Sequence, residues 1–314
     1  MTSFSSSPSF QPRRSRWPRG TAPLAAGLLI VALGGLLATC GLVHRNHVFW
    51  KLRSETATLY LLGSIHFASA SMFPLDSVIE KAYAESDVLV VEANVLKYDQ
   101  AAMQQMITFH AVATDQRRLS ERLGDPDLYR RLQVACAEYN VDLELMQRME
   151  IWFVAISLAA QAIQQLGYSP EHGIDMYFLR RAIAEKDIAE VEGMDEQMRL
   201  FDFLPRAQQL LLLDYTLRDL GSLPVELPLL ISAWETGNVA SIEQSVFRQL
   251  REAPPLQPIF EVVFKKRNQS MADRIRRLML KSHTYFAVVG AGHLVGADSL
   301  LELLTRKGYQ VEQL

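Results

Sequence analysis

The sequence predicts an α/β fold in which two related strand–Gly-x-x-His–helix–strand units form a mixed sheet and flank a large helical insertion. The first observation is an apolar run that ends in Gly-Ser-Ile-His at residues 63–66. The second is a similar run that ends in Gly-Ala-Gly-His at residues 290–293. The third is the mostly helical pattern of the residues between about 98 and 281. Because a short apolar run bounded by a turn signal is typical of a buried strand, both Gly-x-x-His sequences are expected where a strand ends.

The first unit is predicted from residues 47–94. Apolar segments on either side of a polar turn at residues 53–56 predict a hairpin, whose second strand ends at the first Gly-x-x-His. Residues 75–87 carry one apolar stripe at helical spacing and predict an amphipathic helix. The apolar run within residues 87–94 predicts a short strand that is buried on both faces. This order of strand, helix and strand indicates a βαβ-like unit, in which the crossover is usually right-handed.

The insertion is predicted to be helical apart from one short strand. Residues 151–168 are nearly all apolar, and their length and glutamines favour a buried central helix over a second membrane span. Residues 173–187 predict a helix whose inward face includes Ile174 and Ile183, and residues 187–193 predict the strand. The second unit then follows with a strand, a helix and a strand, at residues 283–290, 297–308 and 309–314. The absence of a fixed-period repeat argues against a solenoid.

Charge and cysteine content exclude several classes of protein. Four of the 32 basic residues lie within residues 1–43, which contain no acid, so residues 44–314 hold 28 basic and 35 acidic residues and a net charge of −7. A nucleic-acid partner is therefore not expected, because such a surface needs clustered basic charge. The two cysteines, Cys40 and Cys136, allow neither a disulfide framework nor a cysteine-based metal site. Cys136 shares a helical face with leucines and is interpreted as a small core residue.

The N-terminal 43 residues predict membrane targeting. Residues 1–20 form a basic leader, and residues 21–43 form an uncharged apolar segment long enough to span a bilayer. Arginines before such a segment favour a cytoplasmic leader, so the domain at residues 44–314 is expected in the periplasm or outside the cell. We expect a single-pass inner-membrane anchor. The alternatives are a cleaved signal peptide, which leaves a secreted protein, and a lipid anchor at Cys40.

The candidate site is centred on the two motif histidines, His66 and His293. In an open α/β sheet, ligands bind beyond the carboxyl ends of the strands, which is where both histidines are expected. The motif glycines, Gly63 and Gly290, permit close backbone approach or a positive φ at each strand end. A lone histidine at a strand end is more often structural, but two in matched contexts favour a shared site. If the two units pack side by side, both imidazoles can face one cleft.

Carboxylates at neighbouring strand ends complete the candidate site. Glu92 ends the second strand of the first unit and is expected at the same edge as His66. The alternative is a surface acid, but two histidines and a glutamate at adjacent strand ends match a divalent metal site with open positions. Glu192, just past the strand of the insertion, is a candidate further ligand or general base. Asp175 is expected in the first turn of a helix, where the helix dipole alone explains a carboxylate, so its functional and structural interpretations carry equal weight.

The long helix before the last predicted strand supplies Arg267 and Asn268 as candidate catalytic residues. An arginine can bind a substrate carboxylate or pair with a glutamate of the site. By contrast, His110, His172 and His283 lack a strand-end context and are interpreted as surface or structural residues. A serine hydrolase is disfavoured, because no Gly-x-Ser-x-Gly sequence is present.

These motifs resemble those of the TraB/GumN family, which is related to the Tiki proteins. The resemblance runs from about residue 47 to the C-terminus and rests on the stretches LLGSIHFAS, VVEAN, GIDMYFLRRA, VEGMDEQMRLFDFLP, RNQSMADRI and FAVVGAGHLVG. It implies two α/β halves with helical insertions. For the Tiki branch it also implies a metal-dependent protease activity with manganese or cobalt, and zinc is an alternative. The family's motif residues match His66, His293, Gly63, Gly290, Glu92, Glu192, Arg267 and Asn268, with a valine before Glu192 where the family usually has leucine.

We therefore expect an extracytoplasmic, membrane-tethered metallohydrolase that acts on peptides or on small substrates derived from the envelope. His66, Glu92 and His293 would hold a divalent ion that lowers the pKa of its bound water. Glu192 would act as a base or further ligand, and Arg267 would orient substrate or stabilise negative charge. The rival expectation is a non-catalytic envelope protein whose cleft captures a peptide, a pheromone, or a metal or haem-like ligand. A third is that both histidines are structural and each bonds a backbone carbonyl.

Overall fold

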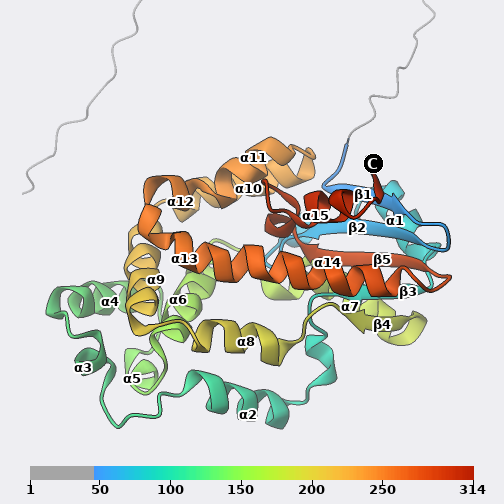
Figure 1. Cartoon of the computed structure of the whole chain (residues 1–314). Helices are drawn as coiled ribbons and strands as arrows, with labels where there is room; N and C mark the ends of the chain where they lie inside the picture. The colour runs from blue at the N-terminus through green and yellow to red at the C-terminus, as the bar shows by residue number, and fades with distance from the viewer. Residues whose placement is uncertain (1–45) are drawn as a thin grey trace, which may run out of the picture. The chain divides into compact units, whose positions relative to one another are not determined.

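A computed structural model describes residues 46–314, which form a six-stranded mixed sheet and the helices around it (Figure 1). The leader and the apolar segment predicted at residues 1–20 and 21–43 lie outside the described residues. Within the described range, no helix is both long enough and apolar enough to cross a membrane. The predicted α/β class with a mixed sheet is confirmed.

The strands lie in the order β4–β3–β5–β2–β1–β6. Strand β1 pairs antiparallel with β2 and with β6, and the remaining neighbours pair parallel. The bounds are Phe49–Arg53 for β1, Thr58–Ser64 for β2, Val88–Val91 for β3, Asp187–Glu190 for β4, Thr284–Gly290 for β5 and Gln310–Gln313 for β6. The predicted hairpin is therefore present as β1 and β2.

The two predicted units interleave within this sheet. Strand β5 of the second unit lies between β2 and β3 of the first, with Ser64 opposite Gly290 in one pair and Val91 opposite Val288 in the other. Helix α1 (Ser77–Ala84) therefore connects two strands that are not neighbours. Because β2, β5, β3 and β4 run parallel, their carboxyl ends lie at one edge of the sheet, and the residues that follow them meet there.

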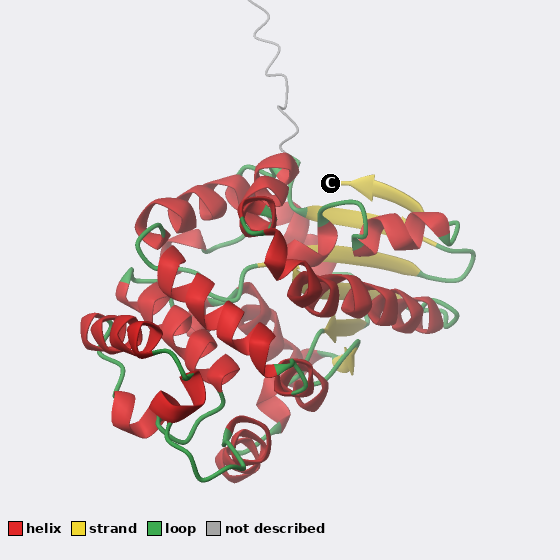
Figure 2. Ribbon diagram, turned by 60° about the vertical axis from the view of Figure 1, so that its left-hand side comes forward, coloured by secondary structure: helices red, strands yellow, loops and turns green. Residues whose placement is uncertain are grey.

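The insertion contributes most of the helices and also strand β4, which forms one edge of the sheet. Figure 2 shows most of these helices gathered to one side of the strands. They are α2 (Gln100–Ala111), α3 (Leu119–Leu123), α4 (Pro126–Glu138), α5 (Leu143–Met146), α6 (Ile151–Gln165), α7 (Ile174–Glu185), α8 (Met194–Asp202), α9 (Arg206–Asp219), α10 (Leu223–Glu235), α11 (Val239–Val246) and α12 (Arg248–Glu252).

The long helix predicted before the last unit is a continuous run of three parts. Helix α13 (Gln257–Phe260) passes into a π-helical segment (Glu261–Lys266) and then into α14 (Arg267–Leu278). π-Helical turns are rare and occur frequently at functional sites. In the second unit, α15 (Leu300–Arg306) connects β5 to β6.

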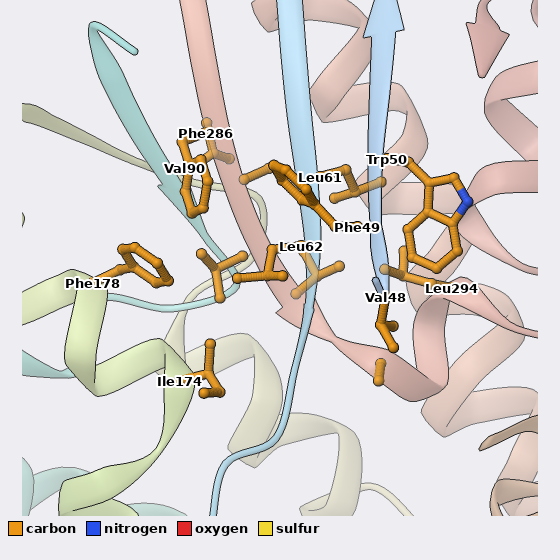
Figure 3. Close-up of a cluster of buried hydrophobic side chains, with 14 of the residues drawn as sticks. Val48, Phe49, Trp50, Leu61, Leu62, Val90, Ile174, Phe178, Phe286 and Leu294 are labelled. Atoms are coloured by element: carbon orange, nitrogen blue, oxygen red, sulfur yellow. The ribbon is translucent and has the colours of Figure 1, made fainter. Parts of the chain in front are cut away.

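The main hydrophobic core lies against the sheet (Figure 3). The ring of Phe286 on β5 lies 4.7 Å from that of Phe178 on α7 and 5.9 Å from that of Phe49 on β1, between ring centroids. Ile174 and Phe178 are fully buried. The inward position predicted for Ile183 is wrong, because this residue is 60% exposed. Ile183 comes nine residues after Ile174. With 3.6 residues per turn this spacing is two and a half turns, which places Ile183 on the opposite face of the helix.

A second core lies within the insertion, between α3, α4, α6 and α9. Cys136 is buried there beside Leu132, so its interpretation as a small core residue is confirmed. The apolar helix α6 contributes Leu158 and Ala155 to the same cluster. The insertion thus has an apolar core of its own and can hold its helices against the carboxyl edge of the sheet.

Candidate functional site

Four parallel strands bring the predicted site residues to one edge of the sheet. His66 follows β2, Glu92 follows β3, and His293 lies in the 3₁₀ turn after β5 (Ala291–Leu294). Glu192 follows β4, and its backbone N–H donates to the carbonyl oxygen of Glu92 at 2.9 Å. The interleaved order explains why residues from both units converge, since β5 places its histidine between the ends of β2 and β3.

Gly290 marks the point where the two histidines and Glu92 come closest. A methyl group built on its Cα would lie 3.3 Å from Glu92 Oε1, 3.6 Å from His293 Cδ2 and 3.7 Å from His66 Nε2. The missing side chain therefore leaves room that all three groups border. Its backbone N–H also donates to Glu92 Oε1 at 2.6 Å. Gly290 is thus part of the site itself.

Gly63 has a different role from Gly290. A Cβ at this position would lie 2.6 Å from Val48 Cγ1 and 3.2 Å from the Cα of Ala291. Its carbonyl oxygen accepts a hydrogen bond of 2.6 Å from Trp234 Nε1. Glycine is needed here because a side chain would clash with Val48 and crowd the backbone of Ala291 in the second Gly-x-x-His segment.

Each motif histidine has its Nδ1 atom fixed by a hydrogen bond. His66 Nδ1 lies 2.8 Å from Asp175 Oδ2, and the hydroxyl of Ser64 donates to the other oxygen of Asp175 at 2.8 Å. His293 Nδ1 lies 2.6 Å from Asn268 Oδ1, and the amide of Asn268 donates to a backbone carbonyl at 2.8 Å. Both acceptors are oxygens, so each Nδ1 carries a proton and Nε2 is the ring atom that can act as a ligand; in His66 a metal ion would have to displace a proton from it.

A cluster of hydrogen bonds ties Glu92 and Glu192 to Arg267. Arg267 Nη2 donates to Oε2 of Glu92 and to Oε2 of Glu192, both at 2.7 Å, and its Nε donates to Glu192 Oε1 at 2.9 Å. Gln197 on α8 donates to the same two Oε2 atoms at 2.9 and 3.0 Å. Both glutamates are buried. One guanidinium and one amide thus bridge two adjacent carboxylates.

The pKa values of the site follow from these contacts. Burial by itself would raise the pKa of Glu92, but the positive charges of His293, Arg267 and His66, with the N–H of Gly290, lower it to about 2. Burial lowers the pKa of His293 to about 4, so this imidazole is neutral at pH 7 and the positive charges near Glu92 that persist there are those of Arg267 and His66. The carboxylate of Asp175 raises the pKa of His66 to about 9, although the side chain of His66 is 60% exposed.

The predicted metal ligands fit a divalent cation in chemistry but are not assembled around one. In residues 46–314, no group of three or more His, Cys, Asp or Glu side chains is arranged so that it could hold a metal ion. His293 Nε2 lies 3.8 Å from Glu92 Oε1, and both oxygens of Glu92 already accept hydrogen bonds. The donor types are nonetheless suitable, since two imidazoles with fixed Nδ1 protons and one ionised carboxylate are common ligands of such ions. Ligation by His66, Glu92 and His293 stays a prediction.

The site opens into a pocket of about 340 Å³. One half of its lining is polar and the other apolar, and the residues are His66, Glu92, Ile156, Gln197, Leu200, Phe201, Val263 and Arg267. A larger pocket of about 720 Å³ shares Leu200 and Arg267 with the first, so these two side chains border both. Concave sites that combine apolar walls with a few convergent polar groups are typical of ligand-binding sites.

The other candidate residues divide between the site and the scaffold. Asp175 lies in the first turn of α7, as predicted, and its contact with His66 favours the functional interpretation over the helix dipole. His172 and His283 are exposed, whereas His110 is buried between Asp195 and Asp202 and is structural. Ser64 donates to Asp175, and a nucleophilic serine would instead bond to a histidine.

Sequence reasoning missed Gln197, although it contacts both glutamates. A glutamine on an amphipathic helix has no local feature that marks it as functional. The one signal was its place in the stretch VEGMDEQMRLFDFLP, which carries part of the family resemblance.

Comparison with known proteins identifies the family of this chain. A model of the TraB/PrgY/gumN family matches residues 48–313. The chain belongs to this family. The match includes all six described strands, from β1 to β6, and both Gly-x-x-His segments lie within it.

Relatives of the TraB/PrgY/gumN chain include bacterial and animal proteins. It is 29% identical to the uncharacterized protein YbaP of Escherichia coli K12, over 82% of this chain and 94% of YbaP. It is 19% identical to an uncharacterized protein of Treponema pallidum, over 84% and 82% of the two chains. It is also 28% identical to Metalloprotease TIKI1 of Danio rerio, over 44% of this chain and 33% of that protein. No solved structure matches.

Proposed function

We propose that this protein is a metal-dependent hydrolase of the cell envelope that acts on peptides. The observation that carries the proposal is the meeting of His66, His293 and Glu92 around Gly290, with both Nδ1 atoms fixed and a pocket beside them. The partial similarity to a protein named a metalloprotease supports the same reaction class. An anchor at residues 21–43 and a body in the periplasm belong to this proposal.

His66, His293 and Glu92 are the residues that would hold the ion, with manganese or cobalt favoured by the family resemblance and zinc as the alternative. When bound, a divalent cation of this kind lowers the pKa of a bound water and polarises a carbonyl group. Asp175 and Asn268 keep the Nδ1 protons in place, so that each Nε2 can act as a ligand.

Arg267 is the residue best placed to handle negative charge on a substrate. Its guanidinium borders both pockets, and its charge is balanced by Glu92 and Glu192. In the proposed reaction, Arg267 orients a substrate carbonyl or carboxylate and stabilises charge that develops on its oxygen. Glu192 accepts three hydrogen bonds from Arg267 and Gln197, which supports a role in holding Arg267 more than the role of a proton acceptor.

The test is digestion of a peptide library by the full-length protein in detergent micelles, supplied in turn with Mn²⁺, Co²⁺ and Zn²⁺. We expect cleavage that depends on one of these ions and is lost in His66→Ala. The matched control is His172→Ala, which removes an exposed histidine outside the site. The proposal is wrong if elemental analysis and calorimetry find no bound divalent ion, or if cleavage is the same in the His66→Ala protein.

A binding protein without turnover is the second candidate. It is favoured by the hydrogen bonds that already occupy both oxygens of Glu92, which leave the carboxylate less free to act as a ligand. Under this function, peptides would bind to the pocket and be recovered intact with every ion. Affinity that survives His66→Ala, with no cleavage in the unaltered protein, would favour it.

A further inference from the structure

The pocket beside the site has an apolar wall that the proposed chemistry does not use. Ile156 from α6, Leu200 and Phe201 from α8, and Val263 from the π-helical segment line this half. Ile156 is 39% exposed, although its neighbours Val154, Ala155 and Leu158 on α6 are buried. An aliphatic side chain that faces a pocket lined by three other apolar residues forms a surface that favours an apolar occupant.

This wall is held in place by contacts with buried residues. Phe201 stacks on Trp152, with ring centroids 5.6 Å apart and an angle of 19° between the planes. Trp152 is 3% exposed, and its backbone N–H donates to Gln209 Oε1 at 3.2 Å. On the other side, Arg267 Nη1 donates to the carbonyl of Val263 at 3.3 Å. The apolar wall and the charged cluster therefore share one scaffold, so their relative position is set before any ligand arrives.

We propose that this wall is a subsite for one apolar side chain of a peptide substrate, either aliphatic or aromatic, next to the bond that is cut. This inference rests on the proposed function. The volume of about 340 Å³ is near the lower end of the range for ligand pockets and suits a single side chain with part of its backbone. A charged side chain at the wall would lose its hydration without gaining a partner.

The rest of the peptide has a route out of this subsite. Leu200 and Arg267 border both this pocket and the larger one of about 720 Å³, whose lining includes the charged residues Glu196 and Lys266. A chain that crosses these two side chains passes into a wider pocket that offers both apolar contacts, such as Phe203 and Val262, and charged ones. Selectivity is therefore expected at one position of the substrate, with tolerance of polar residues further along.

The experiment uses the full-length protein in micelles and a series of peptides that differ at one position, which carries Leu, Phe, Ala, Asp or Lys. We expect Leu or Phe to be preferred over Asp and Lys by at least about tenfold in kcat/KM at one position relative to the cut. Ile156→Lys should reduce this preference about tenfold and improve cleavage of the Asp peptide. Leu145→Lys is the matched control, because Leu145 is 71% exposed on α5 and lines neither pocket.

A second measurement separates this inference from the proposed function. Binding of the same peptides, labelled with a fluorophore, is followed by anisotropy. Cleavage without preference for apolar residues overturns the subsite and leaves the hydrolase intact. Tight binding of the Leu peptide that weakens in Ile156→Lys but not in Leu145→Lys, without any cleavage, supports the subsite and overturns the hydrolase. Peptides that are neither bound nor cut overturn both the subsite and the hydrolase. Equal melting temperatures of Ile156→Lys and Leu145→Lys show that the fold is retained.

Discussion

Arg267 meets Glu192 through two hydrogen bonds side by side, from Nε to Oε1 at 2.9 Å and from Nη2 to Oε2 at 2.7 Å. The same Nη2 also reaches Glu92 Oε2 at 2.7 Å. The side chain of Arg267 is 11% exposed and those of the two glutamates are less so. One planar guanidinium thus fixes two carboxylates from different strands, which a lysine could not do with the same geometry.

Replacement of Arg267 should cost both stability and function. Removing one partner of a buried ion pair typically costs about 3–5 kcal/mol, because the remaining charges are left uncompensated. We expect a loss of that size in Arg267→Ala and a smaller one in Arg267→Lys, with peptide cleavage strongly reduced in both. Urea unfolding at pH 7 measures the loss of stability. Arg199→Ala is the control, because the side chain of Arg199 is 51% exposed. Unchanged unfolding in Arg267→Ala would contradict the importance of this pair.

The two motif glycines should respond differently to alanine. In Gly290→Ala, the new methyl would lie between 3.3 and 3.7 Å from the nearest atoms of Glu92, His293 and His66, so the fold should survive while the space between these groups is filled. In Gly63→Ala, the methyl would lie 2.6 Å from Val48 Cγ1 and overpack the core, which costs about 1–3 kcal/mol.

Calorimetric metal titration and thermal unfolding of the two variants separate these effects. Gly290→Ala should bind Mn²⁺ at least tenfold more weakly and melt within a few degrees of the unaltered protein. Gly63→Ala should melt earlier and, at a temperature where it is folded, bind the ion normally. Normal Mn²⁺ affinity in both variants would show that Gly290, like Gly63, only shapes the backbone.

The residues at the strand ends could be predicted from the sequence for a physical reason. Apolar runs that are buried on both faces read as parallel strands, and parallel strands in one sheet end at one edge. Glu92, His66 and His293 each come directly after such a run or within three residues of it, whereas Glu192 follows β4, an edge strand that is only partly buried. Their placement at one edge of the sheet therefore follows from the strand pattern, without knowledge of the helices.

The partners of these residues could not be predicted, because they come from helices whose position depends on tertiary packing. Asp175 lies 109 residues after His66, and no local pattern indicates that α7 begins beside β2. Gln197 reaches the two glutamates only because α8 lies across the ends of β3 and β4. The order of strands, with β5 between β2 and β3, also depends on contacts far apart in the chain.

The Asp175 carboxylate should tune metal binding through His66. It accepts the Nδ1 proton of His66 and a hydrogen bond from Ser64, which fixes the imidazole ring. Mutation of such an outer partner typically weakens metal binding 10–100-fold. We expect Asp175→Asn to weaken Mn²⁺ binding to this extent in calorimetry while the fold is retained. Glu55→Gln, an exposed change at the opposite end of β2, is the control, and equal affinities in the two variants would exclude a role for Asp175.

The metal-free protein should lose stability as the pH falls from about 6.5 towards 4. Burial lowers the pKa of His293 from 6.5 to about 4, so the unfolded chain takes up this proton before the folded one. The folded protein is therefore stabilised above pH 6.5, and this stability is lost as the pH falls through 4. For this shift in the pKa of His293, the loss is about 3 kcal/mol of unfolding free energy. His66 acts in the opposite sense, because the charge of Asp175 raises its pKa to about 9 and its contribution is lost as the pH rises from 6.5 through 9.

Urea unfolding of the EDTA-treated protein at pH 7 and pH 4.5 tests the effect of His293. The comparison is His293→Gln, which cannot titrate and should lose less stability between the two pH values. Other carboxylates titrate in the same range in both proteins, so only the difference between them reports on His293. Equal losses would show that His293 titrates normally in the fold.

His110 on α2 holds helix α8 in place through contacts on the side of α8 that faces away from the site. Gln197 lies on the same helix. Its side chain is 1% exposed, its Nε2 lies 2.9 Å from Asp195 Oδ1, and its Nδ1 lies 3.2 Å from Asp202 Oδ2. His110→Ala removes both contacts and leaves a cavity between α2 and α8, so we expect a loss of about 2–4 kcal/mol in unfolding free energy. Because Asp195 and Asp202 bracket Gln197 on one helix, the amides of α8 should also exchange hydrogen faster while those of β5 do not. Hydrogen exchange followed by mass spectrometry measures this, with the exposed His172→Ala as control, and unaltered exchange in α8 would show that the helix is held by its other contacts.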